Sequence, residues 1–336
     1  MRIGKQSVKF ENKPVICAAA SIVGKKEGEG PLADDFDVIV ADDYFGEKSW
    51  EKAESRFQEE TAKLALEKAN LTEEEAQFVL AGDLLNQCIG AHYAMRDLNI
   101  PFLGLYGACS TMTESLMLAS MLISGNMADN ALCLTSSHFC SAEKQFRYPL
   151  EYGGQRTPTS QWTVTGSGAA VLKSNGNGPH IIAATPGKII DMGISDANNM
   201  GGAMAPAAAD TLTALFNDTD TEPEDYDLIL TGDLGVVGSD VLCELMDKKG
   251  KNIYPVHNDC GKLIFDIKKQ DVHAGASGCG CCGSVFCGHI YKQLCEKKIK
   301  RMILMATGAL MNSMTLFQGE TIPPIAHAVI IESGEE

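Results

Sequence analysis

Apolar residues along the chain fall into short runs that end in turn residues, and one such run occurs twice. Residues 78–84 read FVLAGDL and residues 228–234 read LILTGDL, so both runs end in Gly-Asp-Leu, 150 residues apart. Each follows a helix-start pattern, a threonine with a glutamate three residues later, at Thr72 and at Thr221. The repetition predicts two related strand-and-turn units, one in each half of the chain.

Further matches relate the rest of the two halves. They pair 107–109 with 277–279, 132–136 with 302–306, 15–19 with 181–185, and 168–172 with 327–331. Between the halves, residues 174–179 read SNGNGP, a cluster of turn-forming residues that is typical of a linker. We therefore predict an N-terminal half over 1–174 and a C-terminal half over 180–336.

Helical spacing appears between the β-rich runs. Trp50, Ala53, Phe57 and Thr61 fall on one face of a helix, whereas 109–124 is apolar nearly all round, which is typical of a buried helix. Alternating strands and helices favour a mostly parallel sheet with helices on its faces. Two such halves would form a crevice where strand ends and helix starts converge.

Composition and charge narrow the function classes. The chain has 336 residues, 45% of them hydrophobic, and a formal net charge of −16, which argues against a nucleic-acid-binding face. The apolar run 15–23 is too short to span a bilayer and favours a buried strand over a signal-peptide core. Twelve cysteines in a chain of this length predict a reducing compartment rather than a disulfide scaffold.

Candidate chemistry lies at one strand-to-helix turn. Cys109 follows the run 102–106 and begins the apolar helix, where unpaired N–H groups favour a thiolate. A small residue chosen for a crowded turn explains the same position equally well, so both interpretations stay open.

The turn 107–110, the duplicated halves and the strand beginning Gly-x-Gly-Ala at Gly166 resemble the thiolase and β-ketoacyl synthase superfamily. Within it, longer strings are similar to the stage V sporulation protein AD family; they lie at 81–87, 136–138, 145–149, 151–155, 203–210 and 257–261. This resemblance implies a thiolase-like αβαβα fold of two pseudo-symmetric halves. It also implies a non-catalytic binder of dipicolinic acid, required for uptake of that acid into the developing spore.

The residues that differ from a condensing enzyme support that interpretation. The resemblance implies that type III synthases pair the cysteine with a histidine and an asparagine from the second half. This chain has Asp233 at the first position and Ala276 near the second, although His257 and Asn258 lie close enough in sequence to be a relocated pair. Acyl transfer through Cys109 therefore remains the alternative function, and Cys109 is otherwise a vestigial nucleophile. No cofactor is expected.

A dicarboxylate ligand requires cations, neutral donors and an apolar face for its ring. The candidate ligand-binding residues are Cys109, His138, Arg147, Asp233, His257, Asn258, Ser277 and His327. Further candidate cations are Lys25, Lys26, Arg156 and Lys188, with a solvated surface charge as the alternative for each. Because the net charge repels a free dianion, the calcium chelate is an equal candidate, with Asp83, Asp233 or Asp259 as oxygen ligands.

Other expectations concern the cysteine-rich run and the partners. Cys279, Cys281 and Cys282 with Cys287 and His289 lack the usual spacing of a zinc site, so close helix packing is the favoured interpretation and no metal site is predicted. The family resemblance implies peripheral attachment to the forespore or spore inner membrane, through other membrane proteins of the stage V transport assembly. The fold class implies a homodimer, and no nucleic-acid partner is expected.

Overall fold

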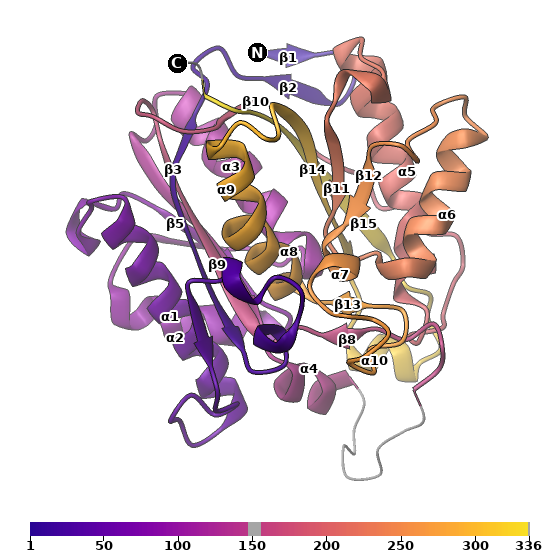
Figure 1. The fold of residues 1–336 in the computed structure, drawn as a ribbon, viewed down its shortest axis with the longest axis horizontal. Coiled ribbons are helices and arrows are strands. Elements are labelled where there is room, and N and C mark those ends of the chain that lie inside the picture. The colour runs from indigo at the N-terminus through magenta and orange to yellow at the C-terminus, as the bar shows by residue number, and fades with distance from the viewer. Residues whose placement is uncertain (147–155, 335–336) are drawn as a thin grey trace.

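A computed structural model describes residues 1–146 and 156–334, and most of its strands form one large sheet that runs through both halves of the chain (Figure 1). The strands follow the order β12-β11-β14-β15-β10-β3-β9-β7-β5-β6. In the first half they are β3 (Val15–Gly24), β5 (Val79–Gly82), β6 (Phe102–Gly104), β7 (Asn130–Ser137) and β9 (Gly166–Lys173). In the second half they are β10 (His180–Thr185), β11 (Leu228–Thr231), β12 (His257–Asp259), β14 (Arg301–Ala309) and β15 (Pro324–Glu332).

The two halves of this sheet have the same internal order. From the centre outward, β3, β9, β7, β5 and β6 correspond to β10, β15, β14, β11 and β12. In each half the first two pairings are antiparallel and the outer two are parallel, as they are for β5 with β6 and for β11 with β12. The predicted repeat of the FVLAGDL and LILTGDL runs is confirmed, because β5 and β11 occupy equivalent positions. The placement of a domain boundary at 174–180 stays a prediction.

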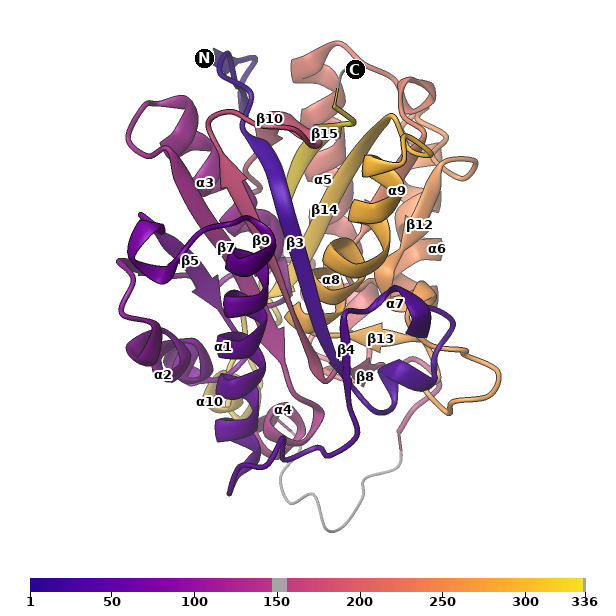
Figure 2. The same ribbon diagram turned by 60° about the vertical axis from the view of Figure 1, so that its left-hand side comes forward.

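Helices form three layers around the sheet, visible from two directions in Figures 1 and 2. One outer layer holds α1 (Trp50–Lys68) and α2 (Ile89–Leu98), and the other holds α5 (Met200–Thr219) and α6 (Gly235–Asp247). Between the two halves of the sheet lie α3 (Thr111–Ser124) and a continuous helical rod of α8 (Cys279–Val285), a π-helical turn (Phe286–Ile290) and α9 (Tyr291–Cys295). This arrangement is the αβαβα fold.

The buried residues follow these layers. One cluster lies between the sheet halves and includes Leu116, Phe286 and Leu304. Separate clusters lie beneath each outer layer, one including Leu66 and the other Leu212. Apolar residues all round α3 are therefore explained by two sheet faces rather than one.

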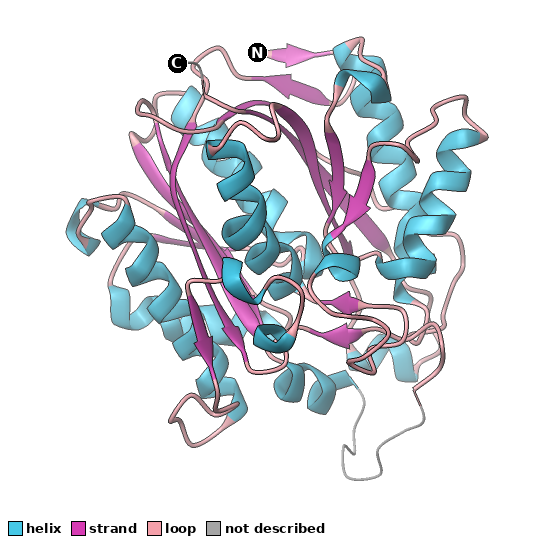
Figure 3. Ribbon diagram, in the orientation of Figure 1, coloured by secondary structure: helices cyan, strands magenta, loops and turns pink. Residues whose placement is uncertain are grey.

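Shorter elements complete the fold and are coloured by type in Figure 3. The helices are α4 (Phe139–Phe146), α7 (Cys260–Leu263) and α10 (Ser313–Phe317); the strands are β1 (Arg2–Ile3), β2 (Ser7–Lys9), β4 (Val38–Val40), β8 (Trp162–Thr163) and β13 (Ala276–Ser277). The two predicted helix starts differ from expectation. Thr72 and Glu75 do form a capping box, but it caps a single 3₁₀ turn; in the second half Glu222 and Asp225 form the box, one residue later than predicted.

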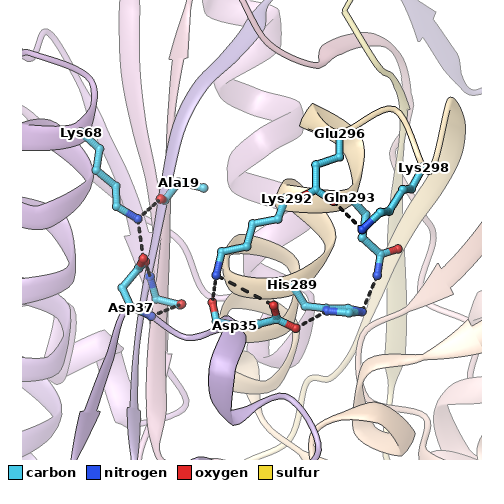
Figure 4. Close-up of polar contacts among 10 residues, drawn as sticks. Ala19, Asp35, Asp37, Lys68, His289, Lys292, Gln293, Glu296 and Lys298 are labelled. Carbon is cyan, nitrogen blue, oxygen red and sulfur yellow. Dashed lines mark hydrogen bonds and ion pairs between the residues drawn. The ribbon is translucent and has the colours of Figure 1, made fainter.

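The segment before α1 is fixed to the core by charged side chains, as Figure 4 shows. Lys68 of α1 donates to Asp37 at 2.6 Å, and Asp35 accepts from His289 at 2.5 Å. Lys292 donates to the Asp35 carbonyl at 2.5 Å. These contacts connect the first half to the π-helical turn of the second half, so His289 has a structural partner.

Glycines allow the central rod to approach the sheet closely. A Cβ atom added to Gly168 of β9 would lie 2.1 Å from the carbonyl oxygen of Gly283 in α8. A Cβ on Gly280 would lie 2.5 Å from the Gly166 carbonyl oxygen. The small residues of the cysteine-rich run are thus required by packing. Among the helices that the structure describes, none is both long and apolar enough to cross a bilayer.

Candidate functional site

A cavity of about 100 Å³ lies where the two central helices begin. Its walls come from both halves: residues after β6, the start of α3, α4, the segment before β8, and the ends of β13 and β14. The polar residues that line it are Tyr106, Cys109, Glu143, Gln161, Thr163, Asn198 and Ser277. The predicted crevice at the junction of the halves is therefore present.

Cys109 lines this cavity from the 3₁₀ turn that precedes α3. The turn is tight because Ala108 has a left-handed backbone, with φ of 47°, a conformation that is uncommon for residues other than glycine. Gly308 of β14 packs against this turn so closely that a Cβ there would lie 2.0 Å from the Gly107 carbonyl oxygen. The side chain of Cys109 is only 7% exposed, so what reaches it must enter the cavity.

Asp233 lies behind Cys109 and is fully buried. Its carboxyl accepts hydrogen bonds from the Gly278 backbone at 2.9 Å, the Ser277 hydroxyl at 3.1 Å and the Thr307 hydroxyl at 3.4 Å. It also interacts with the Cys109 thiol. The position where the resemblance implies a histidine therefore holds a carboxyl group, and it faces the cysteine.

Electrostatics at this pair favour a protonated thiol. Burial, followed by the charge of Asp233, raises the pKa of Cys109 well above its usual value. Burial also raises the pKa of Asp233, to about 6, against hydrogen bonds from Cys109 and Gly278 that lower it. The expectation that the helix start would favour a thiolate is not met, because burial of the thiol, together with the charge of Asp233, outweighs the helix N-terminus.

Of the other predicted residues, Ser277 joins this group and His138 does not. Ser277 lines the cavity and donates to Asp233. The His138 ring is fully buried and does not line the cavity; its Nε2 lies 2.7 Å from the Asp43 carbonyl oxygen. Its Nδ1 accepts from the Cys140 backbone at 3.2 Å, and burial lowers its pKa. Both ring nitrogens are thus occupied by the protein's own backbone.

His257 and Asn258 lie on β12, at the edge of the sheet, and neither lines the cavity. His257 Nε2 lies 3.0 Å from the Thr231 hydroxyl, and burial lowers its pKa to about 4. The Asn258 side chain accepts from the backbone of Asp259 at 2.9 Å. The structure therefore does not bring this pair to Cys109 as a relocated base and donor.

His327 lies on β15 and accepts from the Gly187 backbone at 3.1 Å. Burial lowers its pKa to about 4, and it does not line the cavity. Arg147 lies outside the described residues. The roles of His138, Arg147, His257, Asn258 and His327 as ligand contacts stay predictions.

Three of the other cations that the sequence suggested have partners away from the cavity, and the fourth, Lys25, does not line it. Lys26 donates to the Gln270 carbonyl at 2.6 Å and lies 4.0 Å from the centre of the Trp162 ring. Arg156 binds Asp271 at 2.5 Å, and Lys188 lies 3.9 Å from Asp210. Among the cavity-lining residues that the structure describes, Glu143 carries the only charge.

The aspartates suggested as calcium ligands accept hydrogen bonds from different parts of the backbone. Asp83 accepts from the backbone of Leu85 and Ala91 at 2.8 and 2.7 Å. Asp259 accepts from Leu234 and Gly235 at 2.9 Å each. Within residues 1–146 and 156–334, no group of three His, Cys, Asp or Glu side chains is arranged to hold a metal ion.

Cys279 occupies the position in the second half that matches Cys109. It begins α8, is fully buried, and packs in one cluster with Cys109, Leu84 and Ala142. Burial raises its pKa well above the usual value. One cysteine of the repeated pair thus faces the cavity, and the other lies in the buried cluster next to it.

Several residues of the cavity wall were not among the predicted site residues. Tyr106 could have been predicted from the sequence, because it ends the run that leads into the cysteine turn. Gln161 gave no signal; its amide donates to the carbonyl oxygens of Asp233 and Ala276 at 2.7 and 2.6 Å, which holds β8 against the second half. Glu143 lies on α4 with Phe146, and only the fold brings this face to Cys109.

The chain matches one protein family over nearly its whole length. A family described as "Stage V sporulation protein AD" matches residues 4–332. Stage V sporulation protein AD of Bacillus subtilis (strain 168) is 47% identical over 329 residues, which cover 98% of this chain and 97% of that protein.

Solved structures resemble this chain at lower identity and show the fold alone. The 3-oxoacyl-[acyl-carrier-protein] synthase III from Aquifex aeolicus VF5 has a TM-score of 0.60 at 14% identity, covering 95% of this chain and 99% of that one. Human mitochondrial 3-ketoacyl-CoA thiolase in complex with CoA has a TM-score of 0.59 at 13% identity, covering 98% of this chain and 100% of that one. The thiolase-like fold expected from the sequence is confirmed.

Proposed function

This chain belongs to the stage V sporulation protein AD family, and from that premise we propose that it binds dipicolinic acid without catalysis. The ligand is the free acid or its calcium chelate, and the binding serves uptake of dipicolinic acid into the developing spore. The chain is a sporulation protein with a thiolase-like fold, so its cavity lies where a condensing enzyme would hold its reaction.

One observation carries the non-catalytic part of the proposal. The residue that faces Cys109 is Asp233, a carboxyl group at the position where a condensing enzyme would need a base. A neighbouring carboxylate raises the pKa of a thiol, whereas activation requires an imidazolium or another cation. Cys109 is therefore a neutral contact for a ligand and not a nucleophile.

The cavity supports a small ligand with an apolar ring. Leu84, Ala142, Met204 and Met311 line it beside the polar residues already described. The hydroxyl group of Thr163 and the side-chain amide of Asn198 provide neutral donors for carboxylate oxygens. A flat aromatic dicarboxylate fits this combination of an apolar wall and a few donors.

Charge favours the chelate over the free dianion. Asp233, fully buried behind Cys109, is an acid. A dianion near this carboxylate is repelled in a buried site, while one Ca²⁺ cancels the two ligand charges. We therefore expect the calcium chelate to bind more tightly than the free acid.

Isothermal titration calorimetry with dipicolinate, with and without Ca²⁺, tests this. We expect saturable binding that is about tenfold tighter for the chelate, and a smaller difference in Asp233→Asn because a like charge has been removed. Asp83→Asn is the matched control, since Asp83 is the aspartate of the Gly-Asp-Leu turn in the first half and does not line the cavity. Isophthalate, which lacks the ring nitrogen, is the ligand control. Absence of saturable binding in either form would refute the proposal.

Acyl transfer is the second candidate, favoured by one observation: Cys109 faces the cavity from a strained turn at the start of α3. Incubation with acetyl-CoA and mass spectrometry tests it. A gain of one acetyl group that is lost in Cys109→Ala would support the transferase and contradict the binding-only proposal.

We also propose a homodimer built at the edge of the sheet. β6 is the outermost strand on its side, and Leu103 and Tyr93 next to it are exposed. A bare edge strand with apolar side chains is a favourable place for a second strand to pair. Leu103→Lys should convert a dimer to a monomer in sedimentation equilibrium, whereas a monomeric wild-type protein would refute this part.

Attachment to the spore inner membrane through other membrane proteins of the stage V transport assembly completes the proposal. It is supported by the membership in a sporulation family and by the lack of a membrane-spanning helix among the described residues. Membrane fractions of sporulating cells should retain the protein at low salt and release it at alkaline pH. Retention after alkaline extraction would contradict a peripheral attachment.

A further inference from the structure

Two neighbouring segments carry large apolar side chains that project into solvent. Phe317 at the end of α10 is 82% exposed and Met314 is 68% exposed. In the segment between β10 and α5, Met192 is 67% exposed and Ile189 is 55% exposed. We name these four side chains the apolar rim.

The two segments are held side by side. The Thr321 hydroxyl donates to Asp191 at 2.5 Å, and the Ile322 backbone donates to the Ile194 carbonyl at 2.8 Å. Ile190, Ile194 and Leu316 pack into the same buried cluster. The residues next to the apolar rim pack against the core and fix the backbone of both segments. The rim side chains are therefore exposed because this fixed backbone directs them into solvent, and not because the segments are frayed.

The rim adjoins the cavity. The segment between β10 and α5 continues into Ala197 and Asn198, and α10 is preceded by Ala309 and Met311; all four residues line the cavity. Clusters of exposed Met and aromatic side chains are typical of protein-binding surfaces, because these side chains adapt to a partner and bury a large area.

Charge near the rim identifies the kind of partner. Asp191, Asp196 and Glu320 are exposed beside it, and Lys188 is the only cation in the described segments 186–199 and 309–323. Hydrogen bonds from Thr321 and Gly193 lower the pKa of Asp191, which keeps it ionised. Surfaces that bind anionic lipid carry Lys and Arg around their apolar residues, so this acidic surrounding disfavours direct contact with a membrane.

From these observations we propose that the apolar rim is a docking surface for an apolar, positively charged segment of another protein. Apolar residues of that segment cover Phe317, Met314, Met192 and Ile189, and its Lys or Arg side chains meet Asp191, Asp196 and Glu320. Segments of this composition flank the membrane spans of many membrane proteins. The inference is independent of the ligand proposed for the cavity.

Fluorescence anisotropy with a labelled synthetic peptide of alternating leucine and lysine tests the proposal in the full chain. We expect the double variant Met192→Ser with Phe317→Ser to weaken binding about tenfold, because it removes the two most exposed anchors on different segments. Glu320→Lys should weaken binding about threefold at low salt. Both changes lie on exposed side chains, so thermal unfolding should confirm an intact fold.

The matched control is Met127→Ser with Tyr254→Ser, which removes two other exposed apolar side chains, 63% and 53% exposed. It should change peptide binding less than about twofold. Equal weakening in this control, or equal binding of a serine and lysine peptide, would overturn the proposal. So would binding to phosphatidylglycerol vesicles in place of the peptide, or a dimer that dissociates on Phe317→Ser.

Discussion

The two Gly-Asp-Leu turns begin as copies of one sequence and end in different chemistry. Asp83, after β5, accepts two backbone N–H groups at the start of its own helix, from Leu85 and Ala91. Asp233, after β11, turns the other way and accepts from Ser277 and Gly278 at the start of α8. The first carboxyl completes a helix, and the second becomes part of the cavity.

A neighbouring strand explains the difference. In the second half, Asp259 of β12 caps the start of α6 by accepting from Leu234 and Gly235. In the first half the equivalent position on β6 is Gly104, which has no side chain to offer. Asp83 must therefore cap its own helix, whereas Asp233 is released to face Cys109. The residue at this position of the neighbouring strand therefore distinguishes the two turns, and only the carboxyl of the second half meets Cys109 of the first.

The largest effect is expected from Asp259→Ala, which tests whether Asp259 caps α6. It leaves the buried N–H groups of Leu234 and Gly235 and the Thr231 hydroxyl without their acceptor. We expect a loss of about 3 kcal/mol in the free energy of unfolding, measured by urea denaturation. Asp42→Ala is the control, because Asp42 accepts two N–H groups on an exposed loop. An equal loss in both variants would contradict the capping role.

The two aspartates should also differ in their effect on the reactivity of Cys109. Asp233→Asn removes the charge that raises the thiol pKa, so the rate of alkylation by iodoacetamide at pH 7.5 should rise about tenfold. Peptide mapping by mass spectrometry separates Cys109 from the other cysteines. Asp83→Asn is the matched control and should leave the rate unchanged. A rise in both variants would show that the two carboxyls act alike.

The stability of the protein should change with pH by a smaller amount, through buried acids that lie in both halves. Burial raises the pKa of Asp83 and Asp233 to about 6 and that of Glu27 and Asp259 to about 7. The folded state thus binds protons more tightly than the unfolded chain, and this stabilisation is lost as pH rises through 6 to 7.

We therefore expect the thermal midpoint to rise by about 2 °C from pH 7.5 to 6.5 at constant ionic strength. Below about pH 6.5 the buried His257 and His327, whose pKa values are lowered to about 4, oppose the gain because the unfolded chain protonates them first. Asp259→Asn should reduce the rise between pH 7.5 and 6.5. A midpoint that falls in this interval would be inconsistent with buried acids of raised pKa.

The smallest predicted effect comes from Thr307→Val. Its hydroxyl donates to Asp233 at 3.4 Å, near the limit for a hydrogen bond, and other donors remain. We expect a change in the free energy of unfolding of about 0.5 kcal/mol, measured by urea denaturation. A loss as large as that of Asp259→Ala would mean that the support of Asp233 has been assigned to the wrong donors.

Repetition made much of the fold predictable. The paired FVLAGDL and LILTGDL runs locate β5 and β11, and the match of 107–109 with 277–279 locates the starts of α3 and α8. These strings reflect buried environments that both halves share. The capping box near Thr221 was displaced by one residue because Glu222, with Asp225, supplies the same geometry.

The site was predictable only in part, because it depends on where the halves differ. Cys109, Asp233 and Ser277 could be found from the repeat and the resemblance, since each lies at a helix start. His138, His257 and His327 have chemistry suited to a ligand, yet the sequence does not reveal that their rings pair with Asp43, Thr231 and Gly187. Gln161 and Glu143 enter the cavity through tertiary contacts that no local pattern records.

The position of β15 has a consequence for synthesis of the chain. It is made after every other strand that the structure describes, yet it occupies a central place between β14 and β10. Likewise, α8 fills the inner face of a sheet many of whose strands were made long before. The first half completes its strands by Lys173 but exposes an apolar inner face until the second half arrives. Contacts so distant in sequence slow folding. We expect nascent first halves to depend on chaperones, and a loss of β15 to affect both halves and not one.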